Sequence, residues 1–177
     1  GMEYILTSIL APVPVIHFWF HPLLYYWKRN PYFFYAWTVT IWVGSFFMFR
    51  YIDPISPKIF LQYSSPIFLY AGIFMRFIGA LMVLSSFYIL GWKRFFLWCV
   101  LKPDTPGCRL VMRKGPFEFL PHPAYFGYML LLLGNFFSSG KMYVLVAFGF
   151  LFTFFPIVIM LEDEELKARA KQQPEQS

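Results

Sequence analysis

Residues 108–127 read CRLVMRKGPFEFLPHPAYFG, and this basic, turn-rich stretch interrupts a chain that is mostly apolar on both sides of it. Gly115-Pro116 is typical of a turn, because glycine tolerates unusual dihedral angles and proline fixes φ. Pro123 suits the first turn of a helix, and a proline pushes the residue before it, here His122, toward extended geometry. The stretch therefore predicts a polar loop that ends with an imidazole at a helix entrance.

The composition of the whole chain is that of a membrane protein. Hydrophobic residues make up 59% of the 177 residues and charged residues only 14%, whereas soluble domains have about 25% charged residues. The net charge of +6 does not predict a nucleic-acid partner, because excess Lys and Arg in a membrane protein usually marks the cytoplasmic loops.

Five apolar stretches predict the fold, an all-α polytopic integral membrane bundle of about five transmembrane helices. They cover residues 4–27, 32–49, 67–90, 123–137 and 142–161. The first contains Pro12, Pro14 and Pro22, which predict a kinked or broken element. The fourth is shorter than the roughly 20 residues that cross a bilayer, so we expect it to form a C-terminal helical hairpin with the fifth.

The same stretches divide what we expect to be a single membrane domain, residues 1–177. Three transmembrane segments fall within 2–90, a basic loop covers 91–122, the hairpin covers 123–161, and an acidic and then polar tail covers 162–177. If all five stretches cross, eleven basic residues lie on one side and three, Arg50, Lys58 and Lys141, on the other. This asymmetry predicts that the C-terminus and the 91–122 loop are cytoplasmic.

Several residues inside or beside the apolar stretches have a structural and a functional interpretation. Arg76 lies ten residues into the third stretch, where an ionisable residue is a functional hypothesis by default; it could pair with a substrate anion or hydrogen-bond to backbone. Gly72, Gly79 and Ala80 of that stretch favour close helix packing.

We interpret the other two histidines and the two cysteines as structural residues. His17 and His21 are four residues apart, a spacing compatible with a metal, but the sequence offers no evident third ligand, so we expect interfacial histidines and no metal site. Cys99 and Cys108 are expected to stay unpaired on the cytoplasmic side, where disulfides are rare.

An ordered set of motifs in the C-terminal half resembles the isoprenylcysteine carboxyl methyltransferase and phospholipid methyltransferase superfamily of integral membrane enzymes. The similar positions are Leu90-Gly91, Leu110-Val111, Gly115-Pro116-Phe117, Pro121-His122-Pro123, Tyr125, Gly127, Glu162-Asp163 and Leu166.

The resemblance implies an S-adenosylmethionine-dependent methyltransferase that acts on a membrane-embedded amphiphile. It places the cofactor against His122, Pro123, Tyr125, Gly115, Leu110, Val111, Glu162 and Asp163, and we expect Arg113 and Lys114 to meet the cofactor's carboxylate. If the acceptor is an amine, Glu162 or Glu165, which share a helical face, could take its proton. Arg76 completes the set of candidate catalytic residues.

The acidic run that begins at Glu162 lies at the predicted end of the fifth helix. Negative charges at a helix C-terminus oppose the helix dipole, so we expect a positive group to compensate them.

Departures from the family pattern keep other hypotheses open. Pro121 replaces the usual arginine before His122, and no arginine precedes Glu162. A carboxylate substrate needs a charge-assisted partner, so the sequence favours a phospholipid amine over a prenylcysteine carboxylate. The alternatives are an NADPH-dependent membrane reductase of the sterol-reductase type and a catalytically inactive membrane subunit; no Rossmann fingerprint is present.

Overall fold

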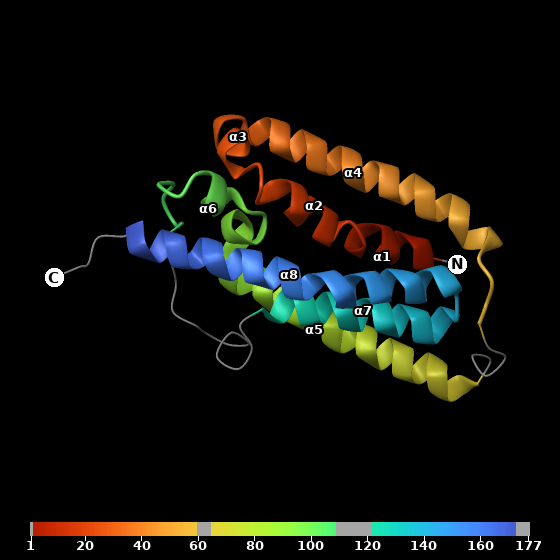
Figure 1. Ribbon diagram of the computed structural model, residues 1–177. Helices are drawn as coiled ribbons and strands as arrows, with labels where there is room; N and C mark the ends of the chain where they lie inside the picture. Colours follow the sequence, from red (N-terminus) through yellow and green to blue (C-terminus); the bar gives the residue numbers. More distant parts are fainter. Residues whose placement is uncertain (1, 60–64, 109–121, 173–177) are drawn as a thin grey trace.

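The computed structural model of the chain describes residues 2–59, 65–108 and 122–172 (Figure 1). Within these ranges every regular element is a helix, and the one β-type pairing is an isolated bridge between Lys58 and Lys141. The predicted all-α class is confirmed.

Prolines break the first apolar stretch into three helices, as the sequence predicts. They are α1 (Glu3–Leu10), α2 (Val13–Phe20) and α3 (Leu24–Arg29). A proline lacks the N–H that continues the helix and clashes with the preceding turn, and Pro12 and Pro22 lie at the two interruptions. α4 (Pro31–Ile52) then runs back along α1 and α2 (Figure 1) and leads into the short 3-10 turn η1 (Asp53–Ile55).

The C-terminal half contains the long helices α5 and α8 and, between them in the sequence, the shorter α6 and α7. α5 (Pro66–Phe95) includes a bend at Gly91, whose φ of 74° favours glycine, and the short α6 (Trp98–Leu101) follows it. α7 (Pro123–Ser139) and α8 (Met142–Gln172) form the predicted antiparallel hairpin. Gly140 closes it in the left-handed conformation that commonly ends helices.

α8 does not end where the sequence predicted. It continues through the acidic run as far as Gln172, with Arg169 and Lys171 in its last turn. The expectation that this run opposes the helix dipole is therefore wrong, because basic residues occupy the C-terminus of the helix. The segment after residue 161 is part of a helix that carries Glu162 and Asp163 at a fixed orientation.

Two pairs of facing glycines let α5 and α7 approach backbone to backbone. A Cβ atom placed on Gly72 would lie 2.6 Å from the Gly134 carbonyl oxygen, and one on Gly79 would lie 2.7 Å from that of Gly127. The glycines of each helix are seven residues apart, so both pairs fall on one face. This confirms the predicted packing role of Gly72 and Gly79.

The outer surface is apolar, as expected of an integral membrane protein. Among the described residues, four spans are long and apolar enough to cross a membrane: Glu3–Phe20, Pro31–Ile55, Pro66–Leu101 and Met142–Gln172. α7 has 17 residues and is the shorter arm of the hairpin. Large apolar side chains such as Tyr88 and Phe152 are exposed on the helices, which suits contact with lipid. One buried cluster joins residues of α1, α4, α7 and α8, and a second joins residues of α2, α3, α4 and α6.

An ion pair and a disulfide lie at opposite ends of the bundle. At the end that holds the N-terminus, Lys141 forms a 3.0 Å ion pair with Asp53, which also accepts a 2.6 Å hydrogen bond from Tyr143. At the other end, Cys99 and Cys108 form a disulfide. The expectation of unpaired cysteines is wrong, because α6 and the turn after it bring the two Cα atoms to 5.1 Å, within disulfide range.

Candidate active site

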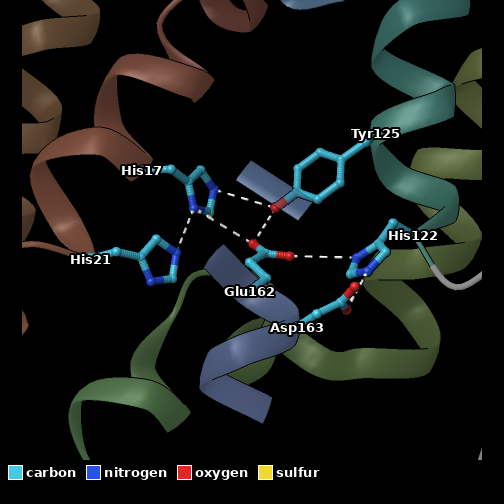
Figure 2. Close-up of polar contacts among 6 residues, drawn as sticks. All are labelled: His17, His21, His122, Tyr125, Glu162 and Asp163. Carbon is cyan, nitrogen blue, oxygen red and sulfur yellow. Dashed lines mark hydrogen bonds and ion pairs between the residues drawn. The ribbon is translucent and has the colours of Figure 1, made fainter. Parts of the chain in front are cut away.

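A cluster of polar side chains gathers where α2, α7 and α8 meet (Figure 2). α2 carries His17, with His21 directly after it, and the start of α7 supplies His122 and Tyr125. α8 supplies Glu162 and Asp163 because it extends past the apolar part of its sequence. Residues more than a hundred positions apart in the sequence thus converge around one carboxylate.

The Glu162 carboxylate is the centre of the cluster, and its two oxygens face different partners (Figure 2). Oε1 accepts a hydrogen bond from the Tyr125 hydroxyl and lies 3.5 Å from His17 Nδ1. Oε2 lies 3.5 Å from His122 Nδ1. Only 19% of the Glu162 side chain is exposed, and buried charges need such partners.

His122 lies between two carboxylates. Its Nε2 is 2.9 Å from Asp163 Oδ1, while its Nδ1 faces Glu162. Burial lowers the pKa of His122, but the hydrogen bonds and charges of Glu162 and Asp163 outweigh burial and raise the pKa above its ordinary value. The ring also stacks on Tyr125, with centroids 5.8 Å apart. Both ring nitrogens therefore have an acceptor, and the ring orientation is fixed.

An apolar cavity of about 1100 Å³ adjoins the cluster. Its walls come mainly from apolar and aromatic residues of α1, α2, α4, α5 and α7. The polar side chains on its wall include His17, Thr38, Arg94, His122 and Glu162. Thr38 is 5% exposed, and its hydroxyl has no hydrogen-bond partner among the described residues. Ligand pockets span about 300–1,000 Å³, so this cavity has room for more than one small ligand.

The structure brings together five of the site residues that the sequence predicted. They are His122, Pro123, Tyr125, Glu162 and Asp163. Glu165 lies about one turn further along α8 and does not line the cavity. Arg76 packs against Gly134 at the contact of α5 and α7, away from the cavity lining. Leu110, Val111, Arg113, Lys114 and Gly115 lie outside the described residues.

Sequence reasoning missed two members of the site. His17 is 6% exposed and contacts both Glu162 and Tyr125, so the interpretation of His17 as an interfacial histidine is wrong. Arg94 of α5 also lines the cavity. The four-residue spacing of His17 and His21 was the one feature of the sequence that could have indicated a site here. The sequence could not show that Glu162, which follows the fifth apolar stretch, contacts His17.

These features define the class of the protein: a helical integral membrane protein with an acidic, histidine-containing site at the polar end of an apolar cavity. The phospholipid methyltransferase family matches residues 67–169, more than half of the chain. The chain belongs to this family of S-adenosylmethionine-dependent membrane methyltransferases. No match was found among curated proteins or among solved structures.

The cavity residues fit the cofactor of this family, S-adenosylmethionine. With the cofactor in this cavity, Glu162 would offer a negative charge to its sulfonium or ammonium group, and Arg94 would offer a positive charge to its carboxylate. The unpartnered Thr38 hydroxyl and the rings of Tyr128 and Trp98 line the same space. The chain therefore presents charges of both signs and aromatic faces, the complement of a zwitterionic nucleoside.

Proposed function

We propose that the enzyme methylates the amine headgroup of a phospholipid. The observation that supports this is the pair of carboxylates, Glu162 and Asp163, around His122 at the polar end of an apolar cavity. Such a site favours a neutral or cationic headgroup and disfavours an anionic one. The apolar wall suits acyl chains, and the many aromatic rings suit a methylated ammonium.

The chain's own residues supply binding, orientation and proton transfer. When bound, S-adenosylmethionine supplies a methyl group on a positively charged sulfur. A protonated amine has no free electron pair, so Glu162, whose carboxylate lines the cavity, is placed to take the proton before transfer, and His122 orients that carboxylate. The cavity walls hold the acceptor in line with the methyl donor, and such positioning accounts for much of the rate enhancement in two-substrate reactions.

Other predicted residues keep more peripheral roles in this proposal. Arg94, Arg113 and Lys114 are candidates for the cofactor's carboxylate, because Arg94 of α5 lines the cavity and the other two belong to the basic stretch before α7. Arg76 and Glu165 are absent from the cavity lining, so we propose that neither contacts the reacting groups.

The acceptor class can be tested with the purified enzyme in lipid nanodiscs. We expect transfer of labelled methyl from S-adenosylmethionine to phosphatidylethanolamine, and little transfer to a prenylcysteine analogue. The physical reason is that the acidic cluster repels a carboxylate acceptor. A higher rate with the prenylcysteine analogue than with any amine lipid would contradict the proposed acceptor and leave the family membership intact.

We also propose that the end of the bundle that holds α3, α6 and the C-terminus faces the cytoplasm. Eight described basic residues belong to α3, to the ends of α5 and α8 or to the C-cap of α6, whereas Arg50, Lys58 and Lys141 belong to the last turn of α4, the segment after η1 and the turn before α8. This asymmetry favours the proposed orientation. The Cys99–Cys108 disulfide lies at the same end, and disulfides are rare in the cytosol. The two indications oppose each other, so the orientation needs a direct measurement.

Cysteine labelling in intact cells provides that measurement. Lys102 caps α6 and Lys58 pairs with Lys141 in the turn between α7 and α8, at the opposite end of the bundle (Figure 1). Both lysines are exposed, whereas Ser139 is too buried to be a good probe. An impermeant thiol reagent should label Lys58→Cys in intact cells and Lys102→Cys only after lysis. The reverse pattern would place the basic end outside and explain the disulfide.

A further inference from the structure

We propose that His17, His21 and Glu162 form a binding site for a divalent transition-metal ion of the zinc type. One ligand atom from each of these residues lies within 4.8 Å of the other two. Two imidazoles and one carboxylate are a donor set that zinc takes in catalytic sites. This inference goes beyond the methyl transfer proposed above and does not depend on it.

Two of the three distances between ligand atoms match a tetrahedral site, and the third, between His21 and Glu162, lies within 4.8 Å. With metal–ligand bonds of about 2.0–2.2 Å, neighbouring ligand atoms in a tetrahedron lie roughly 3.3–3.6 Å apart. His17 Nδ1 lies 3.4 Å from His21 Nε2 and 3.5 Å from Glu162 Oε1 (Figure 2). The three side chains therefore need little movement to surround an ion.

The protonation pattern around His17 also fits a metal. The Tyr125 hydroxyl donates its one proton to Glu162, so its 3.4 Å contact with His17 Nε2 requires that Nε2 carry the proton. In neutral His17, Nδ1 is then an unprotonated acceptor, and it faces a carboxylate oxygen, which is also an acceptor. A cation between these atoms removes the repulsion, whereas a hydrogen bond between two acceptors cannot form.

The surroundings provide the outer contacts that metal sites need. A metal-bound histidine usually donates its other ring N–H to a fixed partner, and Tyr125 is placed to accept from His17 Nε2. The second oxygen of Glu162 faces His122, which orients the carboxylate. If Oε1 of Glu162 binds the ion, Oε2 remains in contact with His122.

A fourth coordination position would adjoin the cavity, because two of the three proposed ligands line it. Both His17 and Glu162 line the cavity, whereas His21 does not. Three protein ligands with one open position are typical of a catalytic rather than a structural zinc site. The ion would therefore be accessible to an oxygen or nitrogen atom of a ligand in the cavity.

Cobalt binding to tag-free protein in detergent tests this site, because tetrahedral Co²⁺ absorbs visible light and Zn²⁺ displaces it. After removal of metals with a chelator, we expect one equivalent of Co²⁺ to bind with a tetrahedral spectrum. His21→Ala and Glu162→Gln should each weaken binding by more than about 100-fold, more than the roughly 10–100-fold that loss of an outer contact causes. His21 is half-buried whereas His17 is buried. His21→Ala should therefore disturb folding less than a substitution at His17.

Two further variants complete the experiment. Glu164→Gln changes an exposed carboxylate on the same helix and should bind Co²⁺ as the wild type does. His122→Ala should keep the tetrahedral spectrum, with binding weaker by about tenfold, because His122 only orients Glu162. Absence of Co²⁺ and Zn²⁺ binding by the folded wild type, or equal binding by His21→Ala, would overturn the proposed site. Binding of S-adenosylhomocysteine, measured on the same preparations, reports separately on the methyltransferase site.

Discussion

Glu162→Gln should lower the rate of methyl transfer to phosphatidylethanolamine by at least about 100-fold, the lower end of what a general acid or base contributes. The substitution keeps the shape of the side chain and removes its charge. Glu162 contacts His17, Tyr125 and His122 at once, so its neutral form weakens every contact that fixes the site. Initial rates with labelled S-adenosylmethionine measure the effect.

The matched control for this prediction is Glu164→Gln. Glu164 lies two residues further along α8 and is exposed, so its substitution should leave the rate within about twofold of wild type, as expected for a surface position. A Glu162→Gln enzyme that is as active as the control would show that the carboxylate at the centre of the cluster plays no part in the reaction.

Gly72→Ala should destabilise the protein by about 1–3 kcal/mol, the usual cost of overpacking. The added methyl group would lie 2.6 Å from the Gly134 carbonyl oxygen and 3.0 Å from the Ser138 backbone nitrogen. Backbone atoms cannot rotate away as a side chain can, so α5 and α7 must separate. The expected result is a lower melting temperature in detergent, measured from loss of helical circular dichroism or from aggregation.

Gly149→Ala is the control for the packing prediction. Nothing lies within 4 Å of a Cβ atom at Gly149, and alanine favours a helix interior over glycine by up to about 1 kcal/mol. The variant should therefore melt at or above the wild-type temperature. Equal melting of the Gly72→Ala variant and the wild type would mean that α5 and α7 are not in backbone contact.

Much of the fold could be predicted from local sequence features. Runs of apolar residues predicted the long helices, Pro12 and Pro22 predicted the breaks before α2 and α3, and the short fourth stretch predicted the hairpin. The end of α8 could not be predicted from hydropathy, because its last three turns are polar. Those turns form a helix because the residues after Leu161 are good helix formers with basic groups at the end.

The candidate site could be predicted only in part. His122, Tyr125 and Glu162 were predicted because they belong to family motifs. His17 has no such motif, and its role depends on a contact with Glu162, 145 positions further along the chain. The disulfide was not predicted, because the expected cytoplasmic side of the membrane argued against it. The distance between the two cysteines is set by α6 and the turn after it.

Binding of S-adenosylhomocysteine to the wild type and to His122→Ala is the most direct test of the central claim, that the cofactor binds at the His122 cluster. The wild type should bind, and the variant should bind about 1–3 kcal/mol more weakly, the cost of losing a hydrogen-bond partner of a buried charged group. His122 also partners Glu162 and Asp163 in the ligand-free protein, so the melting temperature without ligand should fall as well, and the affinity is compared at a temperature at which both proteins are folded. Equal affinity of the two proteins, measured by thermal shift or calorimetry in detergent, would contradict the claim.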